Sequence, residues 1–318
     1  KEMTMIFIGQ PQFSPAARSK NPKHFVQFVV WESDVIPAFW AKYLEDEKCS
    51  QVWVPSTFVR NAVLKRCPNI KDKIVCVPHG VDLTLFQPGE KPKLVPIDKD
   101  AGKEPPFVFY YNKGWSQGMQ DRGGMQFLMK AYSEEFTDKD NVELKLKINS
   151  CYNRPGWDFA NEVDKLGLKK VGAPKVSICM DAVPVEELKH YYCEADVFVA
   201  PTMGEAFGLT LCESMACGIP CIATGWGGHL DFVTEENGWL LPFELFDVTW
   251  DLSYEGCKWA KPDVTELKKL MHKLYNNREE VKTKKEKALE DVKKWSWEES
   301  AVMAVNALKK LFENNIVK

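Results

Sequence analysis

Short apolar runs that alternate with helical patterns most limit how this chain can fold. Strand-like runs lie at residues 5–8, 25–31, 51–55 and 74–78, with helical patterns at 37–43 and 56–66. A second series has strand-like runs at 107–110, 144–148, 176–179, 197–200 and 220–223, with a helical pattern at 123–133. Strands that alternate with helices predict parallel sheets covered by helices. We therefore expect an α/β protein with two Rossmann-like domains.

A polar segment is expected to separate the two domains. Residues 87–106 are rich in proline, lysine and aspartate, without a periodicity that would bury one face. We predict a partial N-terminal Rossmann-like domain at 1–86, a linker at 87–106 and a C-terminal domain at 107–298. Residues 299–318 carry apolar side chains at helical spacing, which predicts a closing amphipathic helix. The lysine- and glutamate-rich stretch 263–294 is interpreted as a solvated helical face.

Composition argues against several classes of protein. A formal charge of -3 gives no global field that would attract nucleic acid. A mean hydropathy of -0.32, without any apolar run of about eighteen residues, predicts no transmembrane segment. The 10 cysteines lack the paired spacing of a zinc site, so we expect reduced structural thiols, Cys151 among them. Since no secretory pattern opens the sequence, the expected location is cytoplasmic, with peripheral membrane binding left open.

The segment 195–224 carries the most information about function. It is predicted to form a strand, a glycine-bearing turn, a helix and a further strand. Ligands of open α/β sheets bind at the carboxyl ends of strands, where the first amides of a helix have no intrahelical partner. Gly204 and Gly208 would keep side chains out of that space. The amides expected to approach a sugar or a diphosphate are those of Phe207, Gly208, Leu209 and Thr210.

Two glutamates flank this turn. Eight positions separate Glu205 from Glu213, which on one ideal helix leaves them about 80° apart. We therefore expect Glu205 in the turn and Glu213 on the helix. There, Glu205 would accept hydrogen bonds from sugar hydroxyls, and Glu213 would bind the paired hydroxyls of a ribose. The alternative is that both glutamates only favour the positive start of a helix.

The string around these glutamates resembles the donor-binding signature of glycosyltransferase family 4. It reads Glu205-Ala-Phe-Gly-Leu-Thr-Leu-Cys-Glu213-Ser-Met-Ala-Cys-Gly218-Ile-Pro220. The likeness continues through 184–196 and 225–238, and earlier through 31–37, 54–58 and 77–82. The resemblance implies the GT-B fold, in which two Rossmann-like domains face a cleft and a C-terminal helix returns towards the first domain. It makes 107–298 the domain that binds a nucleotide-sugar donor and 299–318 a crossover helix.

The resemblance also implies roles for single residues. Glu205 would contact the donor sugar and Glu213 the ribose, while the backbone around Phe207 and Leu209 would contact the sugar and phosphates. The family places two basic residues beside the diphosphate, and the candidates here are Lys113 and Arg122. The family pattern has an arginine first and a lysine after a shorter gap, so the two types are exchanged here. The alternative for Lys113 is a solvated loop lysine.

Three further residues are candidates for the cleft itself. His79 and Gly80 belong to a hinge-like Pro-His-Gly segment, and Glu32 belongs to the part that resembles the acceptor domain. A lone histidine is also a common structural residue. No Asp-x-Asp follows a strand, so we expect no metal ligands, no metal requirement and no cofactor. The resemblance implies a retaining transfer from a nucleoside-diphosphate sugar to a hydroxyl of a glycan, lipid or protein.

The N-terminal domain is expected to be incomplete. About thirty residues precede Trp31, whereas the family's acceptor domain opens with several βα units and a glycine-rich turn. A reduced domain, a truncated chain and completion by a partner chain or an oligomer all remain open. A non-catalytic nucleotide-sugar-binding subunit, or half of a split transferase, is therefore the alternative function. A dinucleotide-dependent oxidoreductase fits the fold but lacks G-x-G-x-x-G after a first strand.

Overall fold

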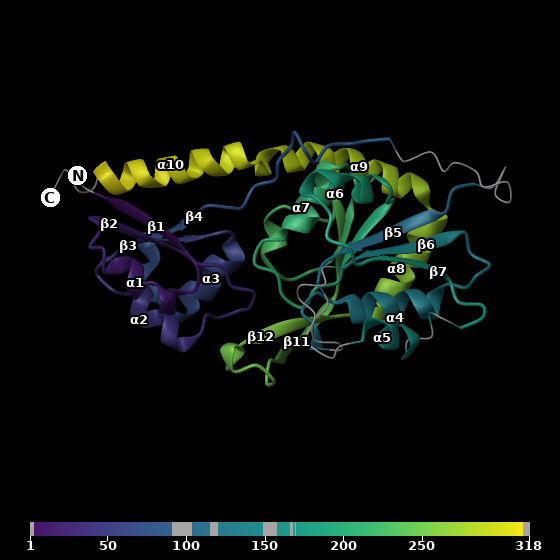
Figure 1. Cartoon of the computed structure of the whole chain (residues 1–318), viewed down its shortest axis with the longest axis horizontal. Helices are drawn as coiled ribbons and strands as arrows, with labels where there is room; N and C mark the ends of the chain where they lie inside the picture. Colours follow the sequence, from purple (N-terminus) through teal and green to yellow (C-terminus); the bar gives the residue numbers. More distant parts are fainter. Residues whose placement is uncertain are drawn as a thin grey trace.

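A computed structural model describes residues 3–90, 104–114, 120–148, 158–165, 168 and 170–313. Most of the predicted linker, residues 91–103, lies outside the described residues, as do residues 115–119 of the basic loop and Cys151. The described chain forms two α/β units side by side, joined along one edge by long helices (Figure 1).

The first unit is a four-stranded parallel sheet in the order β1-β2-β3-β4. Its strands are β1 (Thr4–Ile8), β2 (His24–Phe28), β3 (Cys49–Val54) and β4 (Ile74–Cys76). One face packs on the short helices α1 (Pro15–Arg18) and α2 (Ala41–Leu44) and on α3 (Thr57–Arg66). Ser56 caps α3 by accepting a hydrogen bond from the amide of Val59, as its position before the helix predicts.

The second unit is a six-stranded parallel sheet in the order β10-β9-β8-β5-β6-β7. Its strands are β5 (Phe107–Asn112), β6 (Val142–Lys147), β7 (Lys175–Cys179), β8 (Val197–Ala200), β9 (Cys221–Thr224) and β10 (Gly238–Leu241). The helices between them are α4 (Met125–Glu135), α5 (Phe159–Lys165), α6 (Val185–Cys193) and α7 (Leu209–Ala216). Side chains alternate along β5, with Phe109 in the core under α4 and Tyr110 in the core under α6 and α7. The sheet is therefore covered on both faces, as the alternating pattern predicts.

The order of the strands reverses between β5 and β8. From β5 the chain continues outward through β6 and β7, and β8 returns to the other side of β5 to begin the opposite half. A crevice opens at the carboxyl ends of strands at such a reversal, and it is the usual ligand site of open α/β sheets. The loops that follow β5 and β8 are therefore the first place to look for a site.

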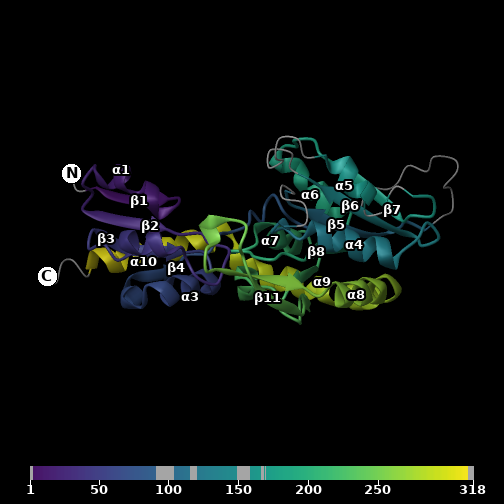
Figure 2. The same ribbon diagram turned by 90° about the horizontal axis from the view of Figure 1, so that it is seen from below.

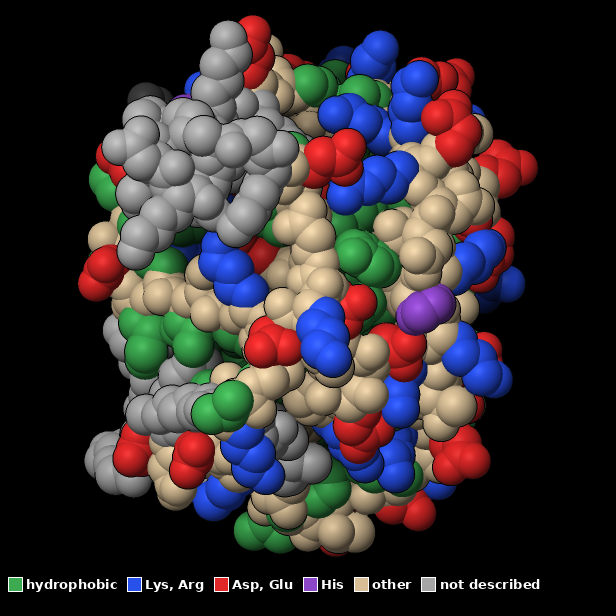
Figure 3. Space-filling model, turned by 90° about the vertical axis from the view of Figure 1, so that its right-hand side faces the viewer, with side chains coloured by type: hydrophobic (Ala, Val, Ile, Leu, Met, Phe, Trp, Pro, Cys, Tyr) green, Lys and Arg blue, Asp and Glu red, His purple; other side chains and the backbone are tan. Residues whose placement is uncertain are grey.

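Three helices complete the fold along one edge. They are α8 (Val264–Asn276), α9 (Arg278–Val292) and α10 (Trp297–Glu313). In α9 only Val281, Ala288 and Val292 are buried, and its charged residues are exposed or half-buried. Over the end of the molecule formed by the second unit, acidic and basic side chains are interspersed (Figure 3).

Helix α10 returns to the first unit and covers the free face of its sheet (Figure 2). Ala307 and Leu311 of α10 pack into one core with Val26 and Trp53 of the sheet. Gln51 Nε2 also donates to the carbonyl of Ala307 at 3.1 Å. The predicted returning helix is confirmed, and the two Rossmann-like units with parallel sheets confirm the predicted fold class.

Two features differ from the sequence-based expectation. The run at 5–8 was expected to be buried, yet β1 lies at a sheet edge, where Ile6 is 42% and Ile8 74% exposed. An antiparallel hairpin of β11 (Phe243–Asp247) and β12 (Lys258–Pro262) was not expected at all. Most of β11 is exposed, so its apolar pattern carries little signal of a buried face.

Candidate active site

A lysine and a glutamate meet at the crevice between β5 and β8. Lys113 directly follows β5, and Glu205 lies in the turn that joins β8 to α7. Lys113 Nζ forms an ion pair with Glu205 Oε2, and the two side chains are only 14% and 15% exposed. The alternative that Lys113 is a solvated loop lysine is therefore wrong. Two residues that are 92 positions apart are brought together by the reversal of strand order.

Glu205 is held in its ionised form. Burial alone would raise the pKa of its carboxyl, but the charges of Lys113 and Arg122 outweigh burial and lower the pKa to about 2. A carboxylate that stays ionised is a strong hydrogen-bond acceptor and a poor proton donor at neutral pH. The turn therefore presents a fixed acceptor beside fixed cations.

Arg122 reaches the same turn from the segment before α4. One guanidinium nitrogen donates to the carbonyl of Gly204 at 2.5 Å, and another lies 3.5 Å from a carboxylate oxygen of Glu32. Burial works to lower the pKa of Arg122, but the charges of Glu32 and Glu205 raise it above its ordinary value. Arg122 thus stays charged and links the first unit to the glutamate turn of the second.

Gly204 has a different role from the one expected. A Cβ atom at this position would lie 2.3 Å from the carbonyl oxygen of Glu32, closer than any real contact. The space that a side chain would take is therefore occupied by the backbone of the first unit, rather than kept open for a ligand. Gly204 allows the two units to approach each other at the site.

Helix α7 begins directly beside these charges. Gly208 is its N-cap residue, with φ of 105°, a backbone conformation that favours glycine. The amides of Leu209 and Thr210, in the first turn, have no acceptor within the helix. Among the described residues, Thr210 Oγ1 is buried without a hydrogen-bond partner. Phe207 is buried, and its side chain packs in the core of the second unit.

Glu213 lies on α7, as expected, and in a different environment from Glu205. Tyr192 donates a hydrogen bond to Glu213 Oε2 at 2.6 Å, and Asn112 Nδ2 donates to the Tyr192 hydroxyl at 3.1 Å. Burial raises the pKa of Glu213 to about 7, although the Tyr192 hydrogen bond opposes this rise. The two glutamates are thus not an acid and base pair on one seam, because each has its own partners.

His79 and Gly80 lie at the junction of the two units. The His79 ring stacks on Phe28 with 5.4 Å between centroids and meets the edge of Phe207 at 5.5 Å. Burial lowers the pKa of His79, although the charge of Glu205 opposes the shift. A Cβ on Gly80 would lie 2.4 Å from the backbone nitrogen of Trp297, so Gly80 lets α10 begin against this segment.

Sequence reasoning missed three residues around the site. Tyr192 positions Glu213, Tyr254 donates to Glu32 at 3.3 Å, and His229 is fully buried near Glu205. The ring nitrogen Nε2 of His229 lies 2.7 Å from the carbonyl of Thr224. His229 directly follows the glycine-rich stretch 225–228, and this glycine content was the available signal. The tyrosines come from distant elements and gave none.

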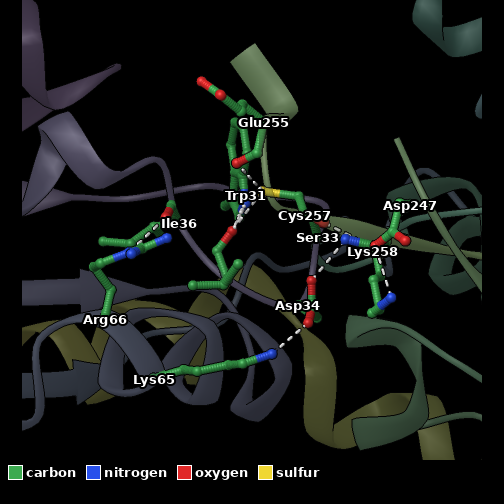
Figure 4. Close-up of polar contacts among 11 residues, drawn as sticks. Trp31, Ser33, Asp34, Ile36, Lys65, Arg66, Asp247, Glu255, Cys257 and Lys258 are labelled. Carbon is green, nitrogen blue, oxygen red and sulfur yellow. Dashed lines mark hydrogen bonds and ion pairs between the residues drawn. The ribbon is translucent and has the colours of Figure 1, made fainter. Parts of the chain in front are cut away.

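The unexpected hairpin fixes the loop that carries Glu32. Ser33 Oγ donates to the carbonyl of Lys258 at 2.6 Å, and the amide of Lys258 donates to Asp34 Oδ1 at 2.8 Å. Cys257 Sγ donates to the carbonyl of Val35 at 3.1 Å (Figure 4). These contacts join the first unit to the start of β12 and hold Glu32 opposite Arg122.

The described part of the chain shows neither a cluster of metal ligands nor a membrane-spanning helix. Among the residues that the structure describes, no three His, Cys, Asp or Glu side chains are grouped so that they could hold a metal ion. Within the same residues, no helix combines the length and the apolar character needed to cross a bilayer. Metal independence stays a prediction.

Part of the chain matches a known protein family. Residues 116–247, which include Arg122 and both glutamates, match the family described as "Glycosyl transferases group 1". This region is GT4-like. A D-inositol 3-phosphate glycosyltransferase of Arthrobacter sp. (strain FB24) is 30% identical over 159 residues, 49% of this chain and 35% of the relative. A D-inositol 3-phosphate glycosyltransferase of Corynebacterium jeikeium is 30% identical over 156 residues, which are 48% of this chain and 35% of the relative. The matched region thus spans about a third of the length of these relatives.

Solved structures show the same fold over nearly the whole chain. Sucrose-phosphate synthase from Thermosynechococcus elongatus superposes with a TM-score of 0.72 at 20% identity, covering 98% of this chain and 74% of the synthase. Anabaena HepE in complex with UDP-glucose superposes with a TM-score of 0.70 at 14% identity, covering 97% of this chain and 78% of HepE. The fold is GT-B, as the resemblance implied.

Proposed function

We propose that this protein transfers a sugar, with retention of configuration and without a metal ion, from a nucleoside-diphosphate sugar to a hydroxyl acceptor. The observation that carries the proposal is the convergence of Lys113 and Arg122 on the Glu205 turn, at the reversal of strand order. Fixed cations at this point stabilise the charge that develops on a departing diphosphate. The likeness to curated glycosyltransferases and to a UDP-glucose complex supports the donor class.

Each residue has a proposed task. Glu205 accepts hydrogen bonds from the donor sugar, while Lys113 leaves its partner and turns with Arg122 towards the diphosphate. The free amides of Leu209 and Thr210 and the unpartnered Thr210 hydroxyl take phosphate oxygens, because a helix start favours anions. Glu213 binds the ribose. Retention and metal independence rest on the family resemblance, and the free thiols of the described cysteines suit a reducing, cytoplasmic location.

The proposal is tested by a thermal-shift screen against nucleoside-diphosphate sugars, followed by a transfer assay. A ligand that binds only the folded state raises the free energy of unfolding, by about 2.7 kcal/mol at a concentration of 100 times its Kd. The melting temperature rises as a result. We expect a shift of several degrees with one or more nucleotide sugars, with EDTA present throughout. The anomeric configuration of the product, read by NMR, tests retention. If no nucleotide sugar shifts the melting temperature, the proposal is wrong.

A second candidate is a non-catalytic subunit or half of a split transferase. The free edge of β1, with Ile6 and Ile8 exposed, favours it, because unpaired strand edges commonly take up a further strand. This candidate predicts donor binding by calorimetry without turnover on any acceptor. Turnover by the isolated chain would rule it out.

Donor affinity should depend on pH through Glu213. Its pKa is about 7 in the folded chain, so the carboxylate that binds ribose hydroxyls most strongly predominates only above pH 7. We expect UDP-glucose to bind several-fold tighter at pH 8 than at pH 6, measured by calorimetry. Glu213→Gln should remove this dependence. Equal pH dependence in both proteins would show that Glu213 does not contact the donor.

The stability of the fold should depend on pH in the opposite direction to donor affinity. The folded chain keeps the Glu213 proton between its unfolded pKa of 4.5 and its folded pKa of about 7, whereas the unfolded chain releases it. The contribution of Glu213 to the free energy of unfolding therefore falls as pH rises through this window. Chemical denaturation of the wild type and Glu213→Gln across pH 5–8 separates this contribution from those of other groups.

A further inference from the structure

An apolar groove lies between α10 and the first two strands of the first sheet. Its volume is about 370 Å³, within the range of about 300–1,000 Å³ found for small-molecule sites. Its walls include Ile8, Phe28 and Val77 from the first unit and Trp297, Ala301 and Ala304 from α10. The polar hydroxyl in its wall, on Ser300, already donates to the carbonyl of Pro78.

The inner end of the groove reaches the candidate active site. His79 lines the groove, stacks on Phe28 and meets the edge of Phe207, two residues beyond Glu205. Trp297 closes the other side of His79, with 6.2 Å between ring centroids. A ligand in the groove would therefore place its inner end at the imidazole, next to the turn that carries Glu205.

The outer end of the groove continues as exposed apolar surface. Ile6 and Ile8 pair in register with Val26 and Phe28, so they share the face of the sheet that α10 covers further along. Ile8 is 74% exposed because α10 does not extend over β1. On α10, Ala301 lines the groove and Val305, one turn further along the same face, is exposed. Exposed apolar side chains thus flank the groove on the side of β1 and on α10.

We propose that this groove holds the hydrocarbon chain of an amphipathic glycoside acceptor, with the hydroxyl that receives the sugar at His79. This inference rests on the proposed function and adds the class of acceptor. A free sugar would need several hydrogen-bonding side chains, whereas the walls offer hydrocarbon and one imidazole. A buried chain is stabilised by roughly 0.8 kcal/mol per methylene, so a long chain suits this surface.

The transfer step balances without any further reactant. The bond between the anomeric carbon and the diphosphate oxygen breaks, and the electron pair stays with the diphosphate. A bond forms between the anomeric carbon and the acceptor oxygen. The proton of that hydroxyl leaves with the nucleoside diphosphate or with buffer. The groove takes no part in these bond changes; it fixes where the hydroxyl lies.

The test uses n-alkyl β-D-glucosides with methyl, butyl and octyl chains, all below their micellar concentrations. Binding to the whole chain is measured by calorimetry, and donor binding is measured separately by thermal shift. We expect octyl glucoside to bind at least tenfold more tightly than butyl glucoside, and methyl glucoside to bind too weakly to detect. The KM in the transfer assay should fall in the same order.

Two neighbouring substitutions on α10 localise the effect. Ala301→Trp fills the groove from its exposed side, and Val302→Trp adds the same side chain where it does not line the groove. Only Ala301→Trp should weaken octyl glucoside, at least tenfold, while both variants keep the donor-induced thermal shift. Affinity that is independent of chain length, or equal effects of both variants, would overturn the inference and leave donor binding intact. Loss of the donor shift in the wild type would instead refute the proposed function.

Discussion

Replacing Glu205 by glutamine should lower kcat/KM for sugar transfer about 100- to 1,000-fold, the usual cost of one hydrogen-bonding group in a preorganised site. Glutamine keeps the shape of the side chain but removes the charge that Lys113 and Arg122 hold ionised. Its amide offers a weaker acceptor to the donor sugar, and it leaves the largely buried ammonium of Lys113 unpaired. Steady-state kinetics with a nucleotide sugar found in the screen measure the effect.

If the Lys113–Glu205 ion pair were purely structural, Glu205→Gln would also lower kcat/KM. A double variant distinguishes a structural role from a catalytic one. Breaking a buried pair from one side typically costs about 3 kcal/mol or more, and removing both charges recovers much of it. Glu205→Gln combined with Lys113→Met should therefore recover stability but not activity. Recovery of activity together with stability would mean that the pair only holds the fold. Glu194→Gln, which breaks the partly exposed ion pair with Lys145, is the matched control and should leave activity unchanged.

Replacing Arg122 by alanine should lower kcat about 100-fold and change the donor KM much less. Charge builds on the diphosphate as the sugar leaves, so a fixed cation acts mainly in the transition state. Single-turnover measurements with saturating donor isolate this step from binding. A large rise in KM with unchanged kcat would mean instead that Arg122 only binds the ground state.

Glu32→Gln provides the control for Arg122→Ala. Arg122 also bridges the two units, with 3.5 Å between its guanidinium and the Glu32 carboxylate. If the main task of Arg122 were to bridge the two units, Glu32→Gln would reproduce most of the loss of kcat. We expect a change of only a few-fold, since the glutamine keeps a polar contact and Arg122 keeps its hydrogen bond to Gly204.

The fold was predictable where one segment carries its own signal. The apolar run at 197–200 coincides with β8, and Ser56 caps α3 because its hydroxyl meets the free amide of Val59. The placement of Glu205 in a turn and Glu213 on a helix followed from the glycine-bearing pattern of 195–224 together with helical geometry. In these cases local backbone preferences and the final packing favour the same structure.

The parts that sequence reasoning missed depend on contacts between distant segments. The hairpin strand β12 is anchored by Ser33 and Asp34, more than 200 positions earlier, and no local pattern records that contact. Tyr192 is buried and donates to Glu213, a contact that no local pattern in the sequence indicates. Gly204 was expected to face a ligand, but the backbone of Glu32 takes that space. A single sequence does not show which unit lies opposite a glycine.

A crystal structure of the chain soaked with UDP-glucose tests the central claim most directly. The account predicts the ribose hydroxyls within hydrogen-bond distance of Glu213 and the diphosphate beside Arg122 at the start of α7. It predicts the glucose hydroxyls on Glu205, with the Lys113 ammonium moved from Glu205 towards the phosphates. A nucleotide sugar bound away from both glutamates, or a Lys113–Glu205 pair unchanged with the donor in place, would contradict it.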